Sequence, residues 1–288
     1  MIETIHQHST SLNIERACEL FEVSRSSYYE RINRKESRRA KENRELNDRI
    51  LKIYENSGRR YGAPKIHQKL AKQGVSISLK RVQKRMKDLN IRSIIVKKWR
   101  PSKSNKSTIQ ERENLLKRDF STTGLNQKWV TDITYIHTVE DGWCYLSSIQ
   151  DLHSKKIIAW SFGKKMTTEL VLDTLDKAVQ TQSISKELVL HSDLGSQYTS
   201  QEYNEQINKL GIRHSFSHKG CPYDNAGIES FHATLKKEEV YQNHYQSFEQ
   251  AKLALFQYIE SFYNHTRIHS SIHYLTPQEM ETLCQQAA

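Results

Sequence analysis

The chain has 288 residues, a formal net charge of +11 and a pI near 9.3. A chain of this length can bury a full hydrophobic core and still carry smaller modules, and its excess of positive charge indicates a polyanionic partner. Its four cysteines are far apart and form no CxxC pair, and no apolar run reaches the roughly 18 residues of a membrane-spanning helix, which disfavours a structural zinc site, a disulfide framework and a membrane protein.

The positive charge is concentrated in the N-terminal part of the chain. Residues 1–120 carry 30 Lys and Arg against 14 Asp and Glu, a net charge of +16, whereas residues 121–288 carry 14 against 19, a net charge of −5. Residues 51–106 alone hold 17 basic groups and 2 acidic ones. We interpret the basic part as the one that meets phosphates; the alternative is a charge bias that only keeps the chain soluble.

Two helix-turn-helix patterns are expected in this basic part. Residues 13–32 predict a helix, a tight turn and a second helix, with Ser24 as the N-cap of the second helix. A polar connecting helix is expected over residues 36–56. The second pattern has Pro64 in the first turn of its first helix and Gly74 at that helix's end.

Residues 79–89 are the predicted groove-reading helix of the second pattern, and Ser78 can cap it. Val82, Met86 and Leu89 fall on one face of this helix, and basic residues cover the other faces, which suits a helix that packs inward and reads DNA outward. The alternative is an ordinary charged surface helix. The DNA-binding candidates of this region are Lys65, Lys80, Arg81, Lys84, Arg85 and Lys87.

These patterns divide the chain into four segments. We predict a helix-turn-helix module over residues 1–35 and a connecting helix with the second DNA-binding module over residues 36–96. Residues 97–126, which are poor in large apolar side chains, are the predicted linker. Residues 127–288 form the predicted core domain with C-terminal helices.

The core domain shows strands and helices in alternation. Strands are predicted at 127–137, 143–151, 156–162, 188–193 and 213–217, and helices at 167–181, 200–210, 224–240 and 247–264. The first three strands follow one another through short connections and are expected to be antiparallel. The fourth is continuously apolar, as expected for a strand covered on both faces. The predicted fold class is therefore α/β with a mixed sheet, preceded by small all-α modules.

Three acidic side chains stand out in the core domain: Asp132, Asp193 and Glu229. Asp132 lies within a strand, where an acid is costly to bury unless it is paired or binds a cation. Asp193 ends an apolar strand, at the kind of sheet edge where α/β proteins bind ligands. Glu229 belongs to a helix. Together they can supply three oxygen ligands to Mg²⁺ ions, and two such ions roughly 4 Å apart can serve a phosphodiester displacement.

Each of these interpretations has a structural alternative. Asp132 can be a solvated acid at a sheet end, and Asp193 a turn or N-cap residue. Lys236 lies nearly in line with the glutamate seven residues before it; it can hold the DNA backbone or belong to a solvated Glu–Lys face. Asp151 is a further candidate acid, although its place before a tight turn favours a turn role. His191 lies on the same strand face as Asp193 and can support that acid. A packed or surface histidine without a role in the site is the commoner case.

Six segments of the chain carry a resemblance to a known family. They are YGAPKI (61–66), NQKWVTDITYI (126–136), HSDLGSQYTS (191–200), YDNAGIESF (223–231), TLKKE (234–238) and YNHTRIHSSIHYLTP (263–277). With these segments the chain resembles the bacterial insertion-sequence transposases that have a retroviral-integrase-like DDE core, and among them the second-frame (OrfB-type) product. The resemblance extends over nearly the whole chain.

The resemblance implies a ribonuclease-H-like catalytic core in which Asp132, Asp193 and Glu229 are the catalytic, metal-binding triad and Lys236 is the basic residue that follows the glutamate. It implies two Mg²⁺ ions, with Mn²⁺ as a substitute. The implied activity is that of a polynucleotidyl transferase, which cleaves insertion-sequence ends and joins them to DNA. The alternatives are a ribonuclease-H-like nuclease without strand transfer and a catalytically inactive DNA-binding regulator.

Four residues depart from the family's pattern. Leu125 stands where proline is common and Leu194 where a polar residue is common. His232 replaces a second aromatic residue, and Gly227 lies inside the glutamate helix, where glycine costs up to about 1 kcal/mol relative to alanine. None of these departures removes one of the three acids.

The resemblance also implies partners and a location. The expected partner is double-stranded DNA, both the element ends and the target. We expect the chain to form a homo-oligomer on DNA. We also expect a first-frame transposase protein as a partner, or a fusion to it. No membrane is expected as a partner. The expected location is the cytoplasm of a bacterium, associated with the nucleoid.

Overall fold

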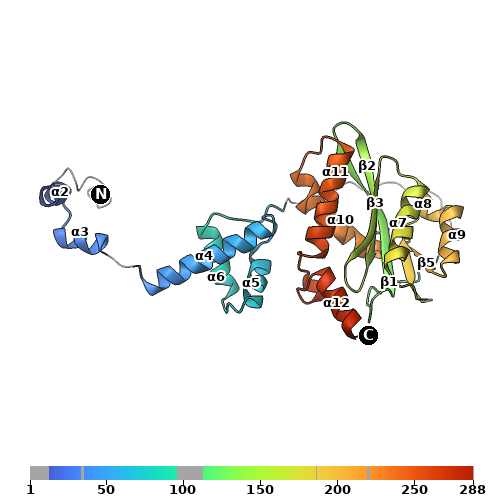
Figure 1. Ribbon diagram of the computed structural model, residues 1–288, viewed down its shortest axis with the longest axis horizontal. Helices are drawn as coiled ribbons and strands as arrows, with labels where there is room; N and C mark the ends of the chain where they lie inside the picture. Colours follow the sequence, from blue (N-terminus) through green and yellow to red (C-terminus); the bar gives the residue numbers. More distant parts are fainter. Residues whose placement is uncertain (1–12, 34–35, 96–112, 186, 219–220, 288) are drawn as a thin grey trace. The chain divides into compact units, whose positions relative to one another are not determined.

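The computed structural model describes residues 13–33, 36–95, 113–185, 187–218 and 221–287 (Figure 1). The chain divides into two compact units, Met1–Lys52 and Ile53–Ala288. No helix in the described ranges is long and apolar enough to cross a membrane.

The first unit contains the predicted N-terminal helix-turn-helix. Its helices are α2 (Ile14–Leu20) and α3 (Arg25–Ile32), followed by α4 (Arg38–Asn56), which continues into the second unit. The hydroxyl of Ser24 accepts a hydrogen bond from the Ser27 amide at 3.1 Å, which confirms Ser24 as an N-cap. Ala17, Cys18 and Tyr28 form the small buried core of this pair of helices.

The second helix pair, which belongs to the second unit, also follows the prediction. It consists of α5 (Ala63–Lys72) and α6 (Leu79–Asp88). Pro64 lies in the first turn of α5, and the Ser78 hydroxyl accepts from the Arg81 amide at the start of α6. Val82 and Met86 are buried and Leu89 is half-buried, so the predicted apolar stripe of α6 packs inward.

The core domain is built on a mixed five-stranded sheet with the order β3-β2-β1-β4-β5. The strands are β1 (Lys128–Thr138), β2 (Gly142–Asp151), β3 (Ile157–Gly163), β4 (Val189–Ser192) and β5 (Arg213–Phe216). β1, β2 and β3 are antiparallel, whereas β4 is parallel to both β1 and β5. This arrangement confirms the predicted α/β class with a mixed sheet.

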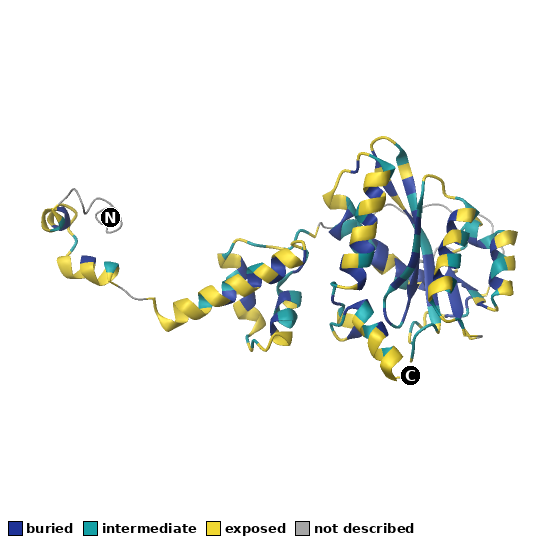
Figure 2. Ribbon diagram, in the orientation of Figure 1, coloured by how far each residue is buried: buried dark blue, intermediate teal, exposed yellow. Residues whose placement is uncertain are grey.

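Helices cover both faces of this sheet (Figure 1). One face carries α7 (Thr168–Thr181), α8 (Ser196–Thr199) and α9 (Gln201–Lys209), and the other carries α10 (Ala226–Glu238), α11 (Phe248–Phe256) and α12 (Pro277–Ala287). Buried residues fill the strands and the inner sides of the helices (Figure 2). All four residues of β4 are buried, as expected for a strand covered on both faces, although His191 and Ser192 make it less apolar than predicted.

The structure refines the predicted C-terminal helices. The helix predicted at 224–240 is preceded by a short 3₁₀ turn, η1 (Pro222–Asn225). The helix predicted at 247–264 is α-helical only to Phe256 and continues as a π-helix, η3 (Gln257–Asn264). Two further short 3₁₀ segments are η2 (Val240–Gln242) and η4 (Ser270–Ile272).

Part of the predicted linker packs on the sheet. Asn114 and Leu116 are buried, and the amide of Leu115 donates to the Ser215 hydroxyl of β5 at 2.9 Å. Residues 97–112 of the predicted linker lie outside the described residues, as do residues 1–12 of the first module. The predicted domain boundaries therefore stay predictions.

The segment before α5 is bonded to the C-terminal part of the core domain, within the same compact unit. The buried Tyr61 donates its hydroxyl hydrogen to the Thr266 carbonyl at 2.9 Å and accepts from the Ile268 amide at 3.1 Å. The Arg60 guanidinium pairs with the Glu239 carboxylate at 2.7 Å. The hydrogen bonds of Tyr61 join two of the family-like segments, 61–66 and 263–277.

Candidate active site

Asp132 lies on β1, just beyond the point where β1 stops pairing with β4. The pairing of β1 with β4 ends at Val130 and His191, so Asp132 lies two residues beyond it and is paired only with Ser148 of β2. Its side chain is half-buried, and one carboxylate oxygen accepts from the Ile133 amide at 2.8 Å. The sheet therefore presents this acid at an accessible edge.

Asp193 follows directly after β4, the neighbour of β1. Its carboxylate accepts from the Gly195 amide at 2.9 Å. Burial raises the pKa of the Asp193 carboxyl, and the negative charge of Asp132 raises it further. Burial raises the pKa of the Tyr198 hydroxyl, and the charges of Asp132 and Asp193 raise it further. Two acids that are 61 residues apart in the sequence are thus brought into electrostatic contact.

Glu229 lies in the first turn of α10, the helix that packs on β1 and β2. Its side chain is exposed. Within the ranges that the structure describes, no three acidic, histidine or cysteine side chains gather closely enough to hold a metal ion. The structure thus couples the two aspartates and places the glutamate on the neighbouring helix, while its role as third ligand stays a prediction.

The chemistry of the two aspartates fits a divalent cation. Both are carboxylates, which are the oxygen ligands that Mg²⁺ prefers. Burial and, after it, the charge of Asp132 raise the pKa of Asp193, and a bound cation would relieve both effects.

His232 connects α10 to Asp132 and was not predicted to do so. Its Nδ1 lies 3.3 Å from a carboxylate oxygen of Asp132, and its Nε2 lies 2.9 Å from the Ser148 hydroxyl. The ring is buried. It lies one helical turn after Glu229 and one turn before Lys236, so the three share a face of α10. The sequence marked this residue only as a departure from the family's pattern.

Lys236 and two exposed aromatic residues lie beside the acids. The ammonium group of Lys236 lies 4.1 Å from the centre of the Tyr135 ring. Burial lowers the pKa of Lys236, and the charge of Asp132 acts in the opposite direction. Tyr135 and Trp143 are 56% and 55% exposed and meet edge to face at 5.1 Å. No local pattern in the sequence predicts this aromatic pair, because the two residues meet only across the β1–β2 ladder.

Two other residues have structural roles. Asp151 is buried and accepts hydrogen bonds from the amides of His153 and Ser154, which confirms its turn role. His191 is buried and bonds the Ser215 hydroxyl at 2.8 Å, and burial lowers its pKa to about 4. His191 is therefore a packed histidine.

The basic residues of α6 are placed as a DNA-facing helix requires. Lys80, Arg81, Lys84 and Lys87 are exposed, whereas Arg85 is half-buried and paired with Asp88. Lys65 lies apart from them, on α5, and is half-buried in the second unit. Their DNA contacts stay predictions.

Comparisons with known proteins cover both the core domain and the second helix pair. Residues 123–222 and residues 210–277 match models of the integrase core domain, and residues 41–99 match the HTH-like domain. The chain is 35% identical over 279 residues to transposase InsF for insertion sequence IS3A of Escherichia coli (strain K12), with 96% of each chain covered. It is 34% identical over 260 residues to the insertion element IS600 uncharacterized 31 kDa protein of Shigella sonnei, with 90% of this chain and 95% of that protein covered.

Solved integrase structures are more distantly similar. The HTLV-2 integrase catalytic core domain in complex with magnesium is 16% identical, covers 56% of this chain and 99% of its own, and gives a TM-score of 0.43. The simian T-cell lymphotropic virus intasome in complex with a PP2A regulatory subunit is 16% identical, covers 81% of this chain and 74% of its own, and gives a TM-score of 0.47.

Proposed function

The chain belongs to the family of insertion-sequence transposases, and from that premise we propose that it cleaves the ends of its element and joins them to target DNA at a site formed by Asp132, Asp193 and Glu229. DNA transposition is the activity of the family. The assignment of the chemistry to these three acids is the proposal.

The electrostatic coupling of Asp132 and Asp193 is the observation that carries this proposal. Two carboxylates that repel each other at one accessible sheet edge are costly without a positive partner. These two aspartates would hold the metal ions, with Glu229 of α10 as the third ligand, and the ions would be Mg²⁺, with Mn²⁺ as a substitute. Bound there, two ions supply positive charge to the attacking and the leaving oxygen of a phosphodiester.

The residues around the acids support a role in positioning. His232, whose ring also bonds the Ser148 hydroxyl of β2, contacts the Asp132 carboxylate from α10. Lys236, whose ammonium group interacts electrostatically with Asp132, offers a cation for a DNA phosphate beside the acids. The exposed rings of Tyr135 and Trp143 provide a surface on which an unpaired base can stack.

The basic helices support recognition of double-stranded DNA. The exposed Lys and Arg of α6 are placed to contact phosphates and base edges of element ends. A homo-oligomer on DNA and a first-frame partner or fusion belong to the same proposal. So does a cytoplasmic, nucleoid-associated location.

The test is incubation of the full chain with labelled element ends, target DNA and Mg²⁺, with and without the first-frame product, followed by mapping of all strands. We expect cleaved ends and joined strands in at least one of the two conditions. Nicks without any joined strand would assign a nuclease. DNA binding without cleavage in either condition would assign a regulator.

A further inference from the structure

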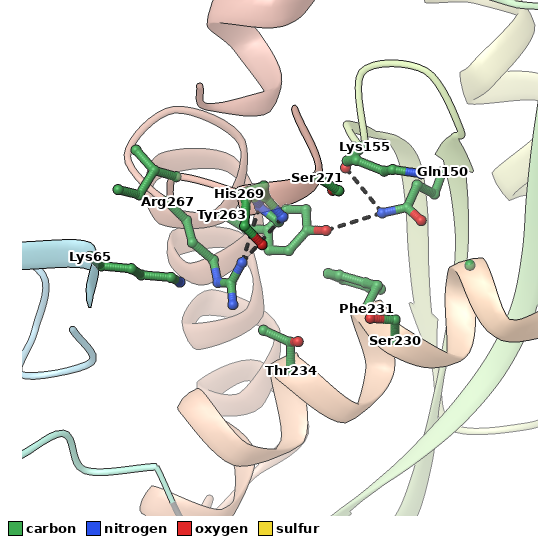
Figure 3. A pocket seen from close by; sticks show the side chains of 13 residues that line it. Lys65, Gln150, Lys155, Ser230, Phe231, Thr234, Tyr263, Arg267, His269 and Ser271 are labelled. Carbon is green, nitrogen blue, oxygen red and sulfur yellow. Dashed lines mark hydrogen bonds between the residues drawn. The ribbon is translucent and has the colours of Figure 1, made fainter. Parts of the chain in front are cut away.

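A cavity of about 430 Å³ lies beside α10 in the second unit (Figure 3). Gly227, Ser230 and Thr234 of α10 line it, and they recur at the spacing of a single helix face. Glu229, His232 and Lys236 recur with the same period on the opposite face. The helix therefore presents one side to the acids and its other side to this cavity.

Two lysines from distant segments reach into the cavity. Lys65 comes from α5, and Lys155 comes from the turn between β2 and β3 (Figure 3). Burial lowers the pKa of both, that of Lys65 to about 8. In the described part of the chain, no carboxylate lies within 4.0 Å of either amine. Half-buried cations without a paired anion are costly, so the cavity favours an anionic ligand.

The third cation of the cavity wall is already compensated. The guanidinium of Arg267 pairs with both carboxylate oxygens of Glu238, at 2.9 and 3.0 Å. Its other nitrogen lies 3.2 Å from the ring of His269. Burial and the charge of Arg267 lower the pKa of His269, so this ring is neutral. The cavity's cations without a carboxylate in direct contact are therefore Lys65 and Lys155, on which Glu238 and Asp151 act only from beyond 4.0 Å.

The position of Lys155 is fixed by its surroundings. Its backbone adopts a left-handed conformation with φ of 62°. Its carbonyl accepts from the buried Gln150 amide group at 3.0 Å, and the same group donates to the Tyr263 hydroxyl at 3.0 Å. The turn that carries this lysine is thus held against the C-terminal segment.

We propose that this cavity binds a phosphodiester group of a DNA strand, as a second DNA-contact site on the face of α10 away from the acids. The two amines supply the charge, and the hydroxyls of Ser230, Thr234 and Ser271 supply hydrogen-bond donors. The volume exceeds that of a single phosphate and falls within the range of about 300–1,000 Å³ for ligand sites, so the flanking sugar atoms also fit. The inference rests on the proposed function, because it takes DNA as the ligand.

The first test is lysine labelling of the full chain with an amine-reactive acetylating reagent, read by mass spectrometry, in EDTA so that no cleavage occurs. The probes are a duplex carrying an element end, inorganic phosphate, and no addition. We expect the duplex to protect Lys65 and Lys155 and to leave the exposed Lys252 of α11 labelled. Equal protection by inorganic phosphate would assign a free-anion site instead, and no protection by either probe would overturn the proposal.

The second test compares the salt dependence of duplex binding in variants. The double variant Lys65→Gln/Lys155→Gln should lower the slope of log K against log salt by about 0.9, since the cavity holds one phosphate and each phosphate contact contributes about 0.9. Lys252→Gln is the matched control and should leave the slope unchanged. An unchanged slope in the double variant would overturn the proposal. Both tests read binding without metal, so they stand apart from any failure of the cleavage assay.

Discussion

Gly227 determines how closely α10 approaches the sheet. A Cβ atom at this position would lie 2.9 Å from Cδ2 of Leu152 and 3.4 Å from Cγ2 of Val130, two buried side chains. Overpacking of this kind costs roughly 1–3 kcal/mol, whereas alanine in place of a helical glycine contributes at most about 1 kcal/mol. We therefore expect Gly227→Ala to lower the free energy of unfolding by about 1 kcal/mol.

The measurement is denaturant unfolding followed by tryptophan fluorescence, for which Trp129 is a fully buried reporter in the sheet. Leu152→Val removes the atom that would clash and should by itself cost about 1 kcal/mol. In the double variant the alanine methyl can occupy the space that is freed. We expect the two effects to fall short of additivity by about 1 kcal/mol, within the range for residues in contact.

The same substitution should affect activity, because α10 carries Glu229 and His232. Cleavage of element ends should fall in Gly227→Ala and recover in part in the double variant. A Gly227→Ala protein at least as stable as the wild type, together with strictly additive effects in the double variant, would refute the reasoning.

The remaining predictions concern the acids, their neighbours and the basic helix. Asp132→Asn, Asp193→Asn and Glu229→Gln should each abolish cleavage and joining while DNA binding persists, and near-normal cleavage by any one would remove that residue from the site. In the absence of metal, Asp193→Asn should raise the thermal midpoint, because it relieves the repulsion from Asp132, and Mg²⁺ should stabilise the wild type but not this variant; calorimetry with and without Mg²⁺ checks both. Lys236→Ala should reduce crosslinking to the cut end more than overall DNA affinity, with Lys236→Arg as the charge-preserving control, and unchanged crosslinking would return Lys236 to a solvated face. Replacing the four exposed cations of α6 (Lys80, Arg81, Lys84 and Lys87) by glutamine should lower the salt slope of duplex binding by up to about 3.6, at about 0.9 per phosphate contact, whereas an unchanged slope would exclude α6 as the DNA-facing helix.

The sequence by itself determined the local elements of this protein. Ser24 and Ser78 were identified as helix caps because a cap depends on residues only two or three positions apart. The α/β class followed from the alternation of strand and helix patterns, and the family from six short segments. The three acids could be singled out because each stands in such a segment.

Only the tertiary structure decided which of these residues meet. Asp132 and Asp193 come together because β1 and β4 are adjacent in the sheet although far apart in the chain. The contact of His232 with Asp132 and the close approach of Gly227 to Leu152 depend on how α10 packs on β1 and β2. Spacing along the chain predicts which face of an element a residue occupies, but the partner of that face is selected by packing between elements, which no local pattern records.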